Sequence, residues 1–211
     1  EMFFLQLKSL SVRAAADAGR SRPIALSSGS REAFLKTLGF ELTGAQKKAI
    51  SEILVDLAGT HPMNRLLNGD VGSGKTAVAM TAMYGASESG FQSALLAPTE
   101  VLATQHAASF ERLFAPLEKN VALLTGSLAT LSGKPISRAA LVKAIAAGIP
   151  DIVIGTHAIL EDKVRFHSLA LVVVDEQHRF GVAQRARLQE KAFESEDGSD
   201  STIPHFLTMT A

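Results

Sequence analysis

The stretch GDVGSGKT is where residue types and spacing most directly predict chemistry in this 211-residue chain. It fits the pattern G-x-x-x-x-G-K-[S/T] at every fixed position. It follows the apolar run 65–67 and precedes the Ala-rich segment 77–82, which is the strand, loop and helix order that a phosphate-binding loop requires. The residues expected to bind a nucleotide are therefore Gly69, Asp70, Val71, Gly72, Ser73, Gly74, Lys75 and Thr76.

The chemistry of this loop suits a triphosphate. Glycines lack a Cβ, so successive backbone N–H groups can point inward and surround an anion. The helix that follows adds the free N–H groups and positive dipole of its N-terminus. Lys75 can reach the β and γ phosphates as a point charge, and the Thr76 hydroxyl is placed to ligate Mg²⁺. The sequence therefore predicts binding of ATP with Mg²⁺.

A second acidic element ends the hydrophobic run 169–174. Asp175 would hold Mg²⁺ opposite Thr76, usually through water, and Glu176 would orient or deprotonate the attacking water. Together with the glycine loop this pair predicts nucleotide hydrolysis. Two alternatives stay open at this point. One is a P-loop phosphotransferase that acts on a small molecule, although such an enzyme would have a pocket for the phosphate acceptor where this chain has Glu-Gln-His. The other is a module that binds a nucleotide without hydrolysing it.

Composition limits the possible partners. The chain has 46% hydrophobic residues, which is ample for a buried core, and 21 basic against 21 acidic residues. Nucleic acid must therefore be contacted locally rather than through a global positive field. The absence of cysteine excludes disulfides and thiolate metal sites. The longest apolar run is far shorter than the ~20 residues that span a bilayer, so we expect no membrane association.

Short apolar segments alternate with helical patterns along the chain. This alternation predicts an α/β fold, with a parallel β-sheet flanked by helices on both faces. Strands are expected at 65–67, 93–96, 121–124, 151–154, 169–174 and 205–208, and helices at 31–38, 43–57, 75–89, 99–114 and 137–147. Carboxyl ends of parallel strands lie along one edge of a sheet, and ligands gather there. The glycine loop and the polar clusters 98–100, 125–127, 155–157 and 175–178 should therefore meet at that edge.

Taken in order, these motifs resemble a superfamily 2 helicase motor domain, and more closely the RecG family of ATP-dependent DNA branch-migration helicases. The resemblance covers about residues 36–211 and implies a RecA-like P-loop NTPase domain. The alternative within this class is the transcription-repair coupling factor, which usually reads DEEHRFG where this chain reads DEQHRFG. The motifs that carry the resemblance are FELTGAQ (40–46), GDVGSGKT (69–76), APTEVLATQH (97–106), TGS (125–127), IVIGTHA (152–158), DEQHRFGVAQR (175–185) and TMTA (208–211).

The resemblance also implies roles for individual residues. Gln46 would recognise adenine by hydrogen bonds, and the ring of Phe40 would stack on the adenine. Thr76 and Asp175 would hold the metal. The residues implied in catalysis are Lys75, Asp175, Glu176, Gln177 and His178, the last two of which would link the γ phosphate to the nucleic-acid side. Contacts to the DNA backbone are implied for Pro98, Thr99, Glu100, Thr125, Gly126, Thr156 and His157.

Domain organisation and partners follow from the same resemblance. Residues 1–35 are similar to the linker that trails the RecG wedge domain, and 36–211 would form the helicase ATP-binding domain, ending within helicase motif III. We therefore expect the chain to be part of a longer polypeptide, in which a wedge and a second motor domain complete the enzyme. The second motor domain would supply an arginine finger, so this part alone should hydrolyse ATP weakly. The expected substrate is forked or branched duplex DNA, acted on by a monomer at the bacterial nucleoid in the cytoplasm, with an organelle as the alternative source.

Overall fold

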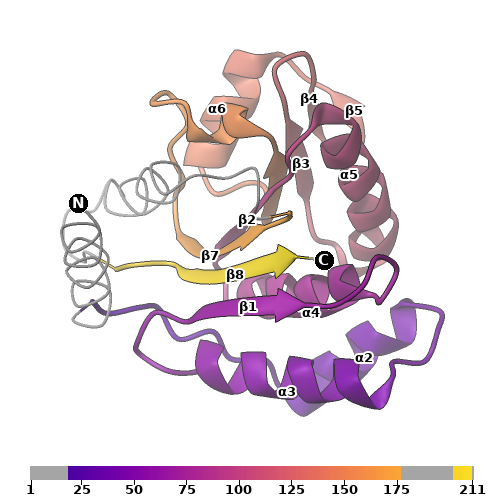
Figure 1. Cartoon of the computed structure of the whole chain (residues 1–211). Coiled ribbons are helices and arrows are strands. Elements are labelled where there is room, and N and C mark those ends of the chain that lie inside the picture. Colours follow the sequence, from indigo (N-terminus) through magenta and orange to yellow (C-terminus); the bar gives the residue numbers. More distant parts are fainter. Residues whose placement is uncertain (1–18, 177–201, 211) are drawn as a thin grey trace, which may run out of the picture.

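The structure, a computed structural model, describes residues 19–176 and 202–210 and is organised around one eight-stranded sheet (Figure 1). The strand order across the sheet is β1-β8-β7-β2-β6-β3-β4-β5. The first six strands in this order pair in parallel, as the alternation of strands and helices predicts. Their bounds are β1 Asn64–Asn68, β8 His205–Thr210, β7 Leu169–Val174, β2 Gln92–Leu96, β6 Ile152–Gly155 and β3 Val121–Leu124.

An antiparallel hairpin extends the sheet beyond β3. It consists of β4 (Ala129–Leu131) and β5 (Lys134–Pro135), joined at Ser132 and Gly133, whose φ angles are 48° and 72°. Two consecutive positive φ values are typical of the tight turns that match the twist of a hairpin. The predicted parallel sheet is thus confirmed for six strands, whereas this edge was not predicted. Strands of three and two residues are too short to show an alternating hydrophobic pattern.

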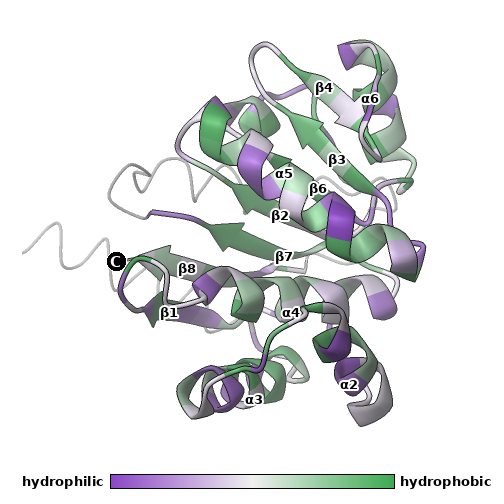
Figure 2. Ribbon diagram, turned by 90° about the vertical axis from the view of Figure 1, so that its right-hand side faces the viewer, coloured by the Kyte–Doolittle hydropathy of each residue, from purple (hydrophilic) through white to green (hydrophobic). Residues whose placement is uncertain are grey.

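Helices cover both faces of the sheet, and the sheet separates two hydrophobic cores. Along β7, Leu171 and Val173 belong to one core, while Val172 and Val174 belong to the other. This alternation explains why the whole strand is apolar, and Figure 2 shows β7 coloured as hydrophobic. The first core contains side chains of α2 (Ser28–Thr37), α3 (Gly44–Leu57), α4 (Lys75–Glu88) and α5 (Glu100–Phe114). The second contains side chains of α6 (Arg138–Ala146) and the 3₁₀ turn η2 (His157–Leu160).

Four aromatic side chains join the helices of the first core. Phe34 of α2 stacks on Tyr84 of α4, with ring centroids 4.7 Å apart. Phe110 and Phe114 of α5 stack at 5.5 Å, just before the 3₁₀ turn η1 (Ala115–Leu117), and Phe114 also lies 5.4 Å from Phe34. These contacts fix α5 against α2 and α4. No helix of the described residues is long and apolar enough to cross a lipid bilayer.

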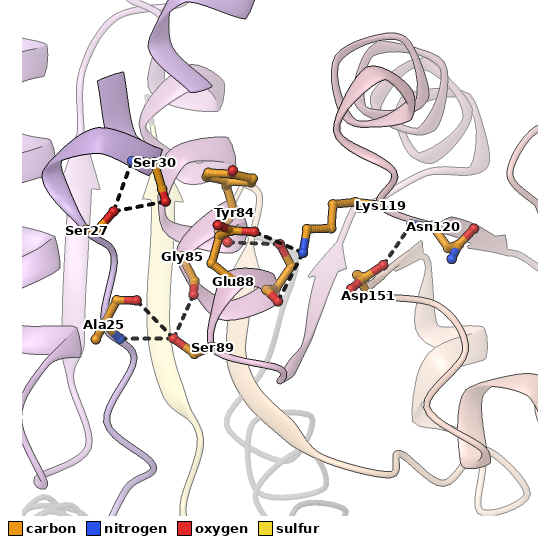
Figure 3. Close-up of polar contacts among 11 residues, drawn as sticks. Ala25, Ser27, Ser30, Tyr84, Gly85, Glu88, Ser89, Lys119, Asn120 and Asp151 are labelled. Carbon is orange, nitrogen blue, oxygen red and sulfur yellow. Dashed lines mark hydrogen bonds and ion pairs between the residues drawn. The ribbon is translucent and has the colours of Figure 1, made fainter. Parts of the chain in front are cut away.

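Residues 20–27, which belong to the segment 1–35 that the resemblance predicts to be a linker, pack against this domain. Ile24 is fully buried, and its N–H donates to the carbonyl of Leu57 at 2.8 Å. The Ser89 hydroxyl at the end of α4 accepts from the Ala25 N–H at 3.0 Å and lies 3.1 Å from the Ala25 carbonyl (Figure 3). The segment therefore forms part of the first core's wall. The predicted domain boundary near residue 35 stays a prediction.

His205, at the start of β8, ties the same segment to the sheet. Its Nδ1 accepts from the N–H of Met63 at 3.0 Å, and its Nε2 donates to the carbonyl of Arg22 at 3.0 Å. The side chain is fully buried, and this desolvation lowers the pKa of His205 below its ordinary value. The imidazole is therefore held neutral with both nitrogens in use.

Candidate functional site

The carboxyl ends of the six parallel strands form one edge of the sheet, here called the rim. Backbone hydrogen bonds join neighbouring strand ends along it. The N–H of Gly69 donates to the carbonyl of Thr210, at 3.3 Å, and that of Asp175 donates to Leu96, at 2.9 Å. The N–H of Ala97 donates to Gly155, at 2.8 Å. The glycine loop and the polar clusters after β2, β6 and β7 therefore lie on one edge, as expected for a parallel sheet.

The strand order divides the rim into two halves. The glycine-loop half comprises β1, β8 and β7, and so carries residues 69–76 and Asp175. The threonine half comprises β2, β6 and β3, which are followed by Thr99, Thr156 and Thr125. Lys75, Thr76 and Asp175, which are expected to act on the nucleotide, thus lie on one half, and the residues expected to contact DNA lie on the other.

The glycine loop connects β1 to α4 and wraps around the ammonium group of Lys75. Gly72 and Gly74 have φ angles of 80° and 79°, and Gly74 is the N-cap of α4. Such angles strain residues that have a Cβ, which explains the glycines at positions 72 and 74. Lys75 Nζ donates to the carbonyl of Gly69 and to that of Asp70, the second at 2.9 Å. The loop therefore has its cation at the centre and the first N–H groups of α4 beside it.

Gln46 fastens the glycine loop to α3. Its Nε2 donates to the carbonyl of Ser73 at 2.8 Å, and its Oε1 accepts from the N–H of Thr43 at 2.8 Å. Thr43 Oγ1 in turn accepts from the Gln46 N–H, which completes a capping box at the start of α3. The structure therefore gives Gln46 a supporting role that the sequence did not predict, while its reading of adenine stays a prediction.

Phe40 lies in a groove beside the start of α3. The side chain is 54% exposed, so its ring presents a free face to the solvent. An exposed aromatic ring is suited to stacking on a flat heterocycle. The groove has a volume of about 570 Å³ and is lined by Glu32, Leu35, Lys36, Gly39, Phe40, Glu41, Leu42 and Lys47. This geometry is compatible with the predicted base stacking by Phe40.

Asp175 and Glu176 follow β7 at the rim. The Asp175 carboxylate is largely buried, and its Oδ2 lies 2.8 Å from Nε2 of His106 on α5. Glu176 is exposed, with a φ angle of 52° that is uncommon for a residue with a Cβ. Gln177 and His178, the other predicted catalytic residues, lie outside the described residues.

The oxygen ligands available at this half suit magnesium. The Thr76 hydroxyl and the Asp175 carboxylate are hard oxygen donors. Within residues 19–176 and 202–210, no group of three or more His, Cys, Asp or Glu side chains could hold a metal by itself. Mg²⁺ usually takes only one or two protein ligands and fills its octahedron with water and substrate phosphates. The donor set therefore fits an ion that arrives with a nucleotide.

The threonine half turns two of its hydroxyl groups inward. Thr125 Oγ1 accepts from the N–H of Ser127 at 3.3 Å and from that of Leu128 at 3.0 Å, and the residue is fully buried. Thr156 is also buried, and its Oγ1 has no hydrogen-bond partner among the described residues. Gly126 and His157 are exposed beside them. In this half, the groups exposed for contact with a ligand are therefore backbone groups and residues such as Gly126 and His157.

Glu100 holds the loop that follows β3. Its Oε2 accepts from the Ser127 hydroxyl at 2.5 Å, and its Oε1 accepts from the Ser127 N–H at 3.2 Å. The hydroxyl donor is the main reason that the pKa of Glu100 is lowered. Thr99 caps the same helix, since its Oγ1 accepts from the Leu102 N–H at 3.2 Å. These contacts show that both side chains support the rim; Pro98 beside them is partly exposed.

Three supporting residues were not predicted from the sequence. Arg138 of α6 donates to the carbonyl of Thr125 at 2.6 Å and to Glu161 at 2.7 Å. Gly155 allows β6 to approach β3, because a Cβ there would lie 1.9 Å from the Leu124 carbonyl oxygen. His106 lies within the stretch 97–106, yet nothing in the sequence connects it with Asp175, which is 69 residues further on. Such roles depend on which strands become neighbours.

Comparison with known proteins identifies this arrangement of sheet, glycine loop and acidic strand end. Residues 43–211 match the family model described as DEAD/DEAH box helicase. The chain therefore belongs to the DEAD/DEAH box helicase family. The Pyrococcus furiosus Hef helicase domain shares the fold, with a TM-score of 0.59 and 23% identity over 84% of this chain and 34% of that one.

The similarity to RecG, indicated by the sequence motifs, is confirmed. ATP-dependent DNA helicase RecG of Bacillus subtilis (strain 168) is 51% identical over 178 residues, which cover 84% of this chain and 24% of the relative. RecG of Escherichia coli O127:H6 is 44% identical over 211 residues, covering 100% of this chain and 29% of the relative. A structure of RecG bound to a three-way DNA junction matches with a TM-score of 0.79 and 36% identity, over 99% of this chain and 26% of that one. The chain thus spans only about a quarter of these proteins.

Proposed function

We propose that this chain is the ATP-binding motor part of a RecG-type ATP-dependent DNA helicase that remodels stalled replication forks and Holliday junctions. The observation that carries the proposal is the position of Lys75 within the glycine loop and of Asp175 on the same half of the rim. This arrangement occurs in a chain 44% and 51% identical to two RecG helicases. The family model supports a nucleotide-driven motor, and the RecG relatives support DNA as its substrate.

In this proposal the residues of the glycine-loop half divide the work on the nucleotide. The first N–H groups of α4 and the Lys75 ammonium bind the β and γ phosphates. Thr76 and Asp175 hold Mg²⁺, which neutralises charge that develops on the phosphates. Glu176 lies just after Asp175 at the exposed edge, where it orients the attacking water. Gln46 keeps the loop in place through Ser73.

The threonine half would bind DNA without reading its sequence. The chain carries equal numbers of basic and acidic residues, so affinity must come from local hydrogen bonds to phosphates. Exposed Gly126 and His157 lie where such contacts are expected. We propose forked or branched duplex DNA as the substrate, with a wedge domain and a second motor domain completing a monomeric enzyme at the bacterial nucleoid. A RecG relative has been seen on a three-way DNA junction, which supports this choice.

The test replaces the lysine at the centre of the loop, in the polypeptide that includes the proposed second motor domain. Lys75→Ala should lower DNA-stimulated ATP turnover by about 10²- to 10³-fold, because a charge-stabilising donor is lost. Binding of forked DNA should be retained. Lys143→Ala, an exposed lysine on α6, is the matched control and should hydrolyse ATP normally. Undiminished turnover by Lys75→Ala would refute this function for the site.

Two alternatives differ from the proposal in measurable ways. A transcription-repair coupling factor would use the same motor to push RNA polymerase, and would not unwind branched DNA. A P-loop phosphotransferase would form a phosphorylated small molecule. Phosphate release that forked DNA stimulates, accompanied by unwinding and without a phosphorylated product, favours the RecG-type helicase over both.

A further inference from the structure

His106 and Asp175 form a largely buried side-chain pair beneath the rim. Nε2 of His106 lies 2.8 Å from Oδ2 of Asp175, and the two side chains are only 12% and 16% exposed. An ionised carboxylate can only accept hydrogen bonds, so the proton of this bond must be on Nε2. The alternation along β7 explains the direction of the carboxylate. Val173 lies in the core that contains α5 and Val174 lies in the opposite core, so the next residue turns back toward α5.

We infer that His106 is a positioning residue for the magnesium ion of the proposed ATP site. By holding Oδ2, the imidazole fixes the rotation of the carboxylate and leaves Oδ1 as the oxygen that would serve the proposed ion. The inference rests on the proposed function, because it concerns the same site. It adds a residue to which neither the motifs nor the family comparison assigns a role.

The physical reason is the strictness of magnesium coordination. Mg²⁺ requires a nearly ideal octahedron, so a carboxylate that rotates freely presents its oxygen correctly only part of the time. Groups that hydrogen-bond to a metal ligand commonly change metal affinity or activity by about 10- to 100-fold. The backbone of Asp175 is already fixed, since its N–H donates to Leu96 at 2.9 Å. The hydrogen bond from His106 then restricts the rotation of the Asp175 side chain.

The helix that carries His106 also connects this pair to the threonine half of the rim. At its first turn α5 holds the loop of the threonine half through Glu100 and Ser127. One helix therefore contacts both halves of the rim, at Ser127 and at Asp175.

The experiment compares His106→Ala and His106→Gln in the 211-residue chain. Binding of a fluorescent ADP analogue is titrated at rising Mg²⁺ concentrations, and thermal unfolding is recorded in parallel. His106→Ala should raise the Mg²⁺ concentration for half-maximal enhancement of binding by about 10-fold or more. His106→Gln, whose amide nitrogen can replace Nε2 as donor, should restore most of it. His61→Ala is the matched control and should behave as the wild type, because this exposed histidine precedes β1, at the opposite edge of the sheet from the rim.

A purely structural histidine would give a different result. The inference is overturned if His106→Ala lowers the melting temperature but leaves the Mg²⁺ dependence unchanged, or if the Ala and Gln variants shift it equally. Nitrogen-15 spectra of the His106 ring provide a test without nucleotide: Nε2 should carry the proton, and its resonance should move in Asp175→Asn. An unprotonated or unresponsive Nε2 also overturns the inference. Failure of the wild-type chain to bind the analogue would instead refute the proposed function.

Discussion

The two halves of the rim differ in the work that we propose for their polar side chains. In the glycine-loop half, the Lys75 ammonium and the Asp175 carboxylate form hydrogen bonds within the protein and are also proposed to hold a nucleotide and its metal. In the threonine half, the Thr125 hydroxyl and the Glu100 carboxylate form hydrogen bonds within the protein. A charged ligand of fixed shape requires particular side chains, whereas a DNA backbone of any sequence can be bound by correctly placed amides.

Because of this difference, substitutions in the two halves should impair function in different ways. The glycine-loop half should lose its chemistry when a charged side chain is removed, as tested with Lys75. The threonine half should lose function when its loops move, even where the altered residue never contacts DNA.

The first prediction concerns the close approach of β6 and β3 in the threonine half. Gly155→Ala should destabilise the chain by about 3 kcal/mol, because the added Cβ would meet the Leu124 carbonyl oxygen at 1.9 Å. The strands must separate, and the loops after Leu124 and Gly155 must separate with them. Chemical denaturation followed by circular dichroism measures the change in unfolding free energy. Gly90→Ala is the control for added volume, since nothing lies within 4 Å of the place that its Cβ would occupy, although its φ of 76° will itself add some strain.

Where Gly155→Ala still folds, the contrast between the halves becomes measurable in one variant. DNA affinity should fall, while affinity for a fluorescent ADP analogue with Mg²⁺ should remain near that of the wild type. Equal losses of both would show that the rim behaves as one unit, and the distinction between its halves would then be wrong.

Sequence patterns predicted the glycine-loop half more completely than the threonine half. The pattern 69–76 prescribes its own local structure, so the strand, the loop and the start of α4 all follow from adjacent residues. The parallel pairing of six strands also followed from their alternation with helices. The bonds of Arg138 to Thr125 and of His106 to Asp175 could not be predicted, because they join residues that only the folded topology brings together.

The second prediction uses pH to weaken the start of β8, a strand of the glycine-loop half. The pKa of His205 is lowered in the folded chain by burial, whereas in the unfolded chain it is close to the ordinary value of about 6.5. Above that pH the imidazole is neutral in both states, and its contribution to stability is complete. As the pH falls through 6.5 toward the folded pKa, the unfolded state binds the proton first, so the free energy of unfolding should decrease. Melting temperatures between about pH 8 and pH 5 measure this slope.

His205→Gln separates this histidine from other titrating groups. The variant removes the imidazole at the start of β8, so the loss of stability as the pH falls below about 6.5 should become smaller than in the wild type. His167→Gln, at a histidine on the loop before β7, serves as the control and should keep the wild-type slope. An unchanged slope in His205→Gln would assign the acid sensitivity to other residues.

The third prediction concerns the carboxylate that holds the loop of the threonine half. Glu100→Ala removes the acceptor of both the Ser127 hydroxyl and the Ser127 N–H, so the loop should lose its fixed position. We expect affinity for forked DNA to fall by roughly threefold to tenfold, as for the loss of one or two hydrogen bonds. Glu100→Gln keeps an acceptor oxygen but removes a negative charge near the expected phosphates, so its affinity should equal or exceed that of the wild type.

Glu111 provides a matched control on the same helix. Its carboxylate also accepts a loop N–H, that of Gly133 at 3.0 Å, but it does so at the hairpin edge and away from the rim. Glu111→Ala should therefore bind forked DNA as the wild type does, measured by fluorescence anisotropy at a fixed salt concentration. If Glu100→Ala and Glu100→Gln lose affinity equally, the loop is held only by the charged carboxylate, whose hydrogen bonds from Ser127 are stronger than those to a neutral amide oxygen. The threonine half would then depend on a charged side chain, as the glycine-loop half does, and the contrast between them would disappear.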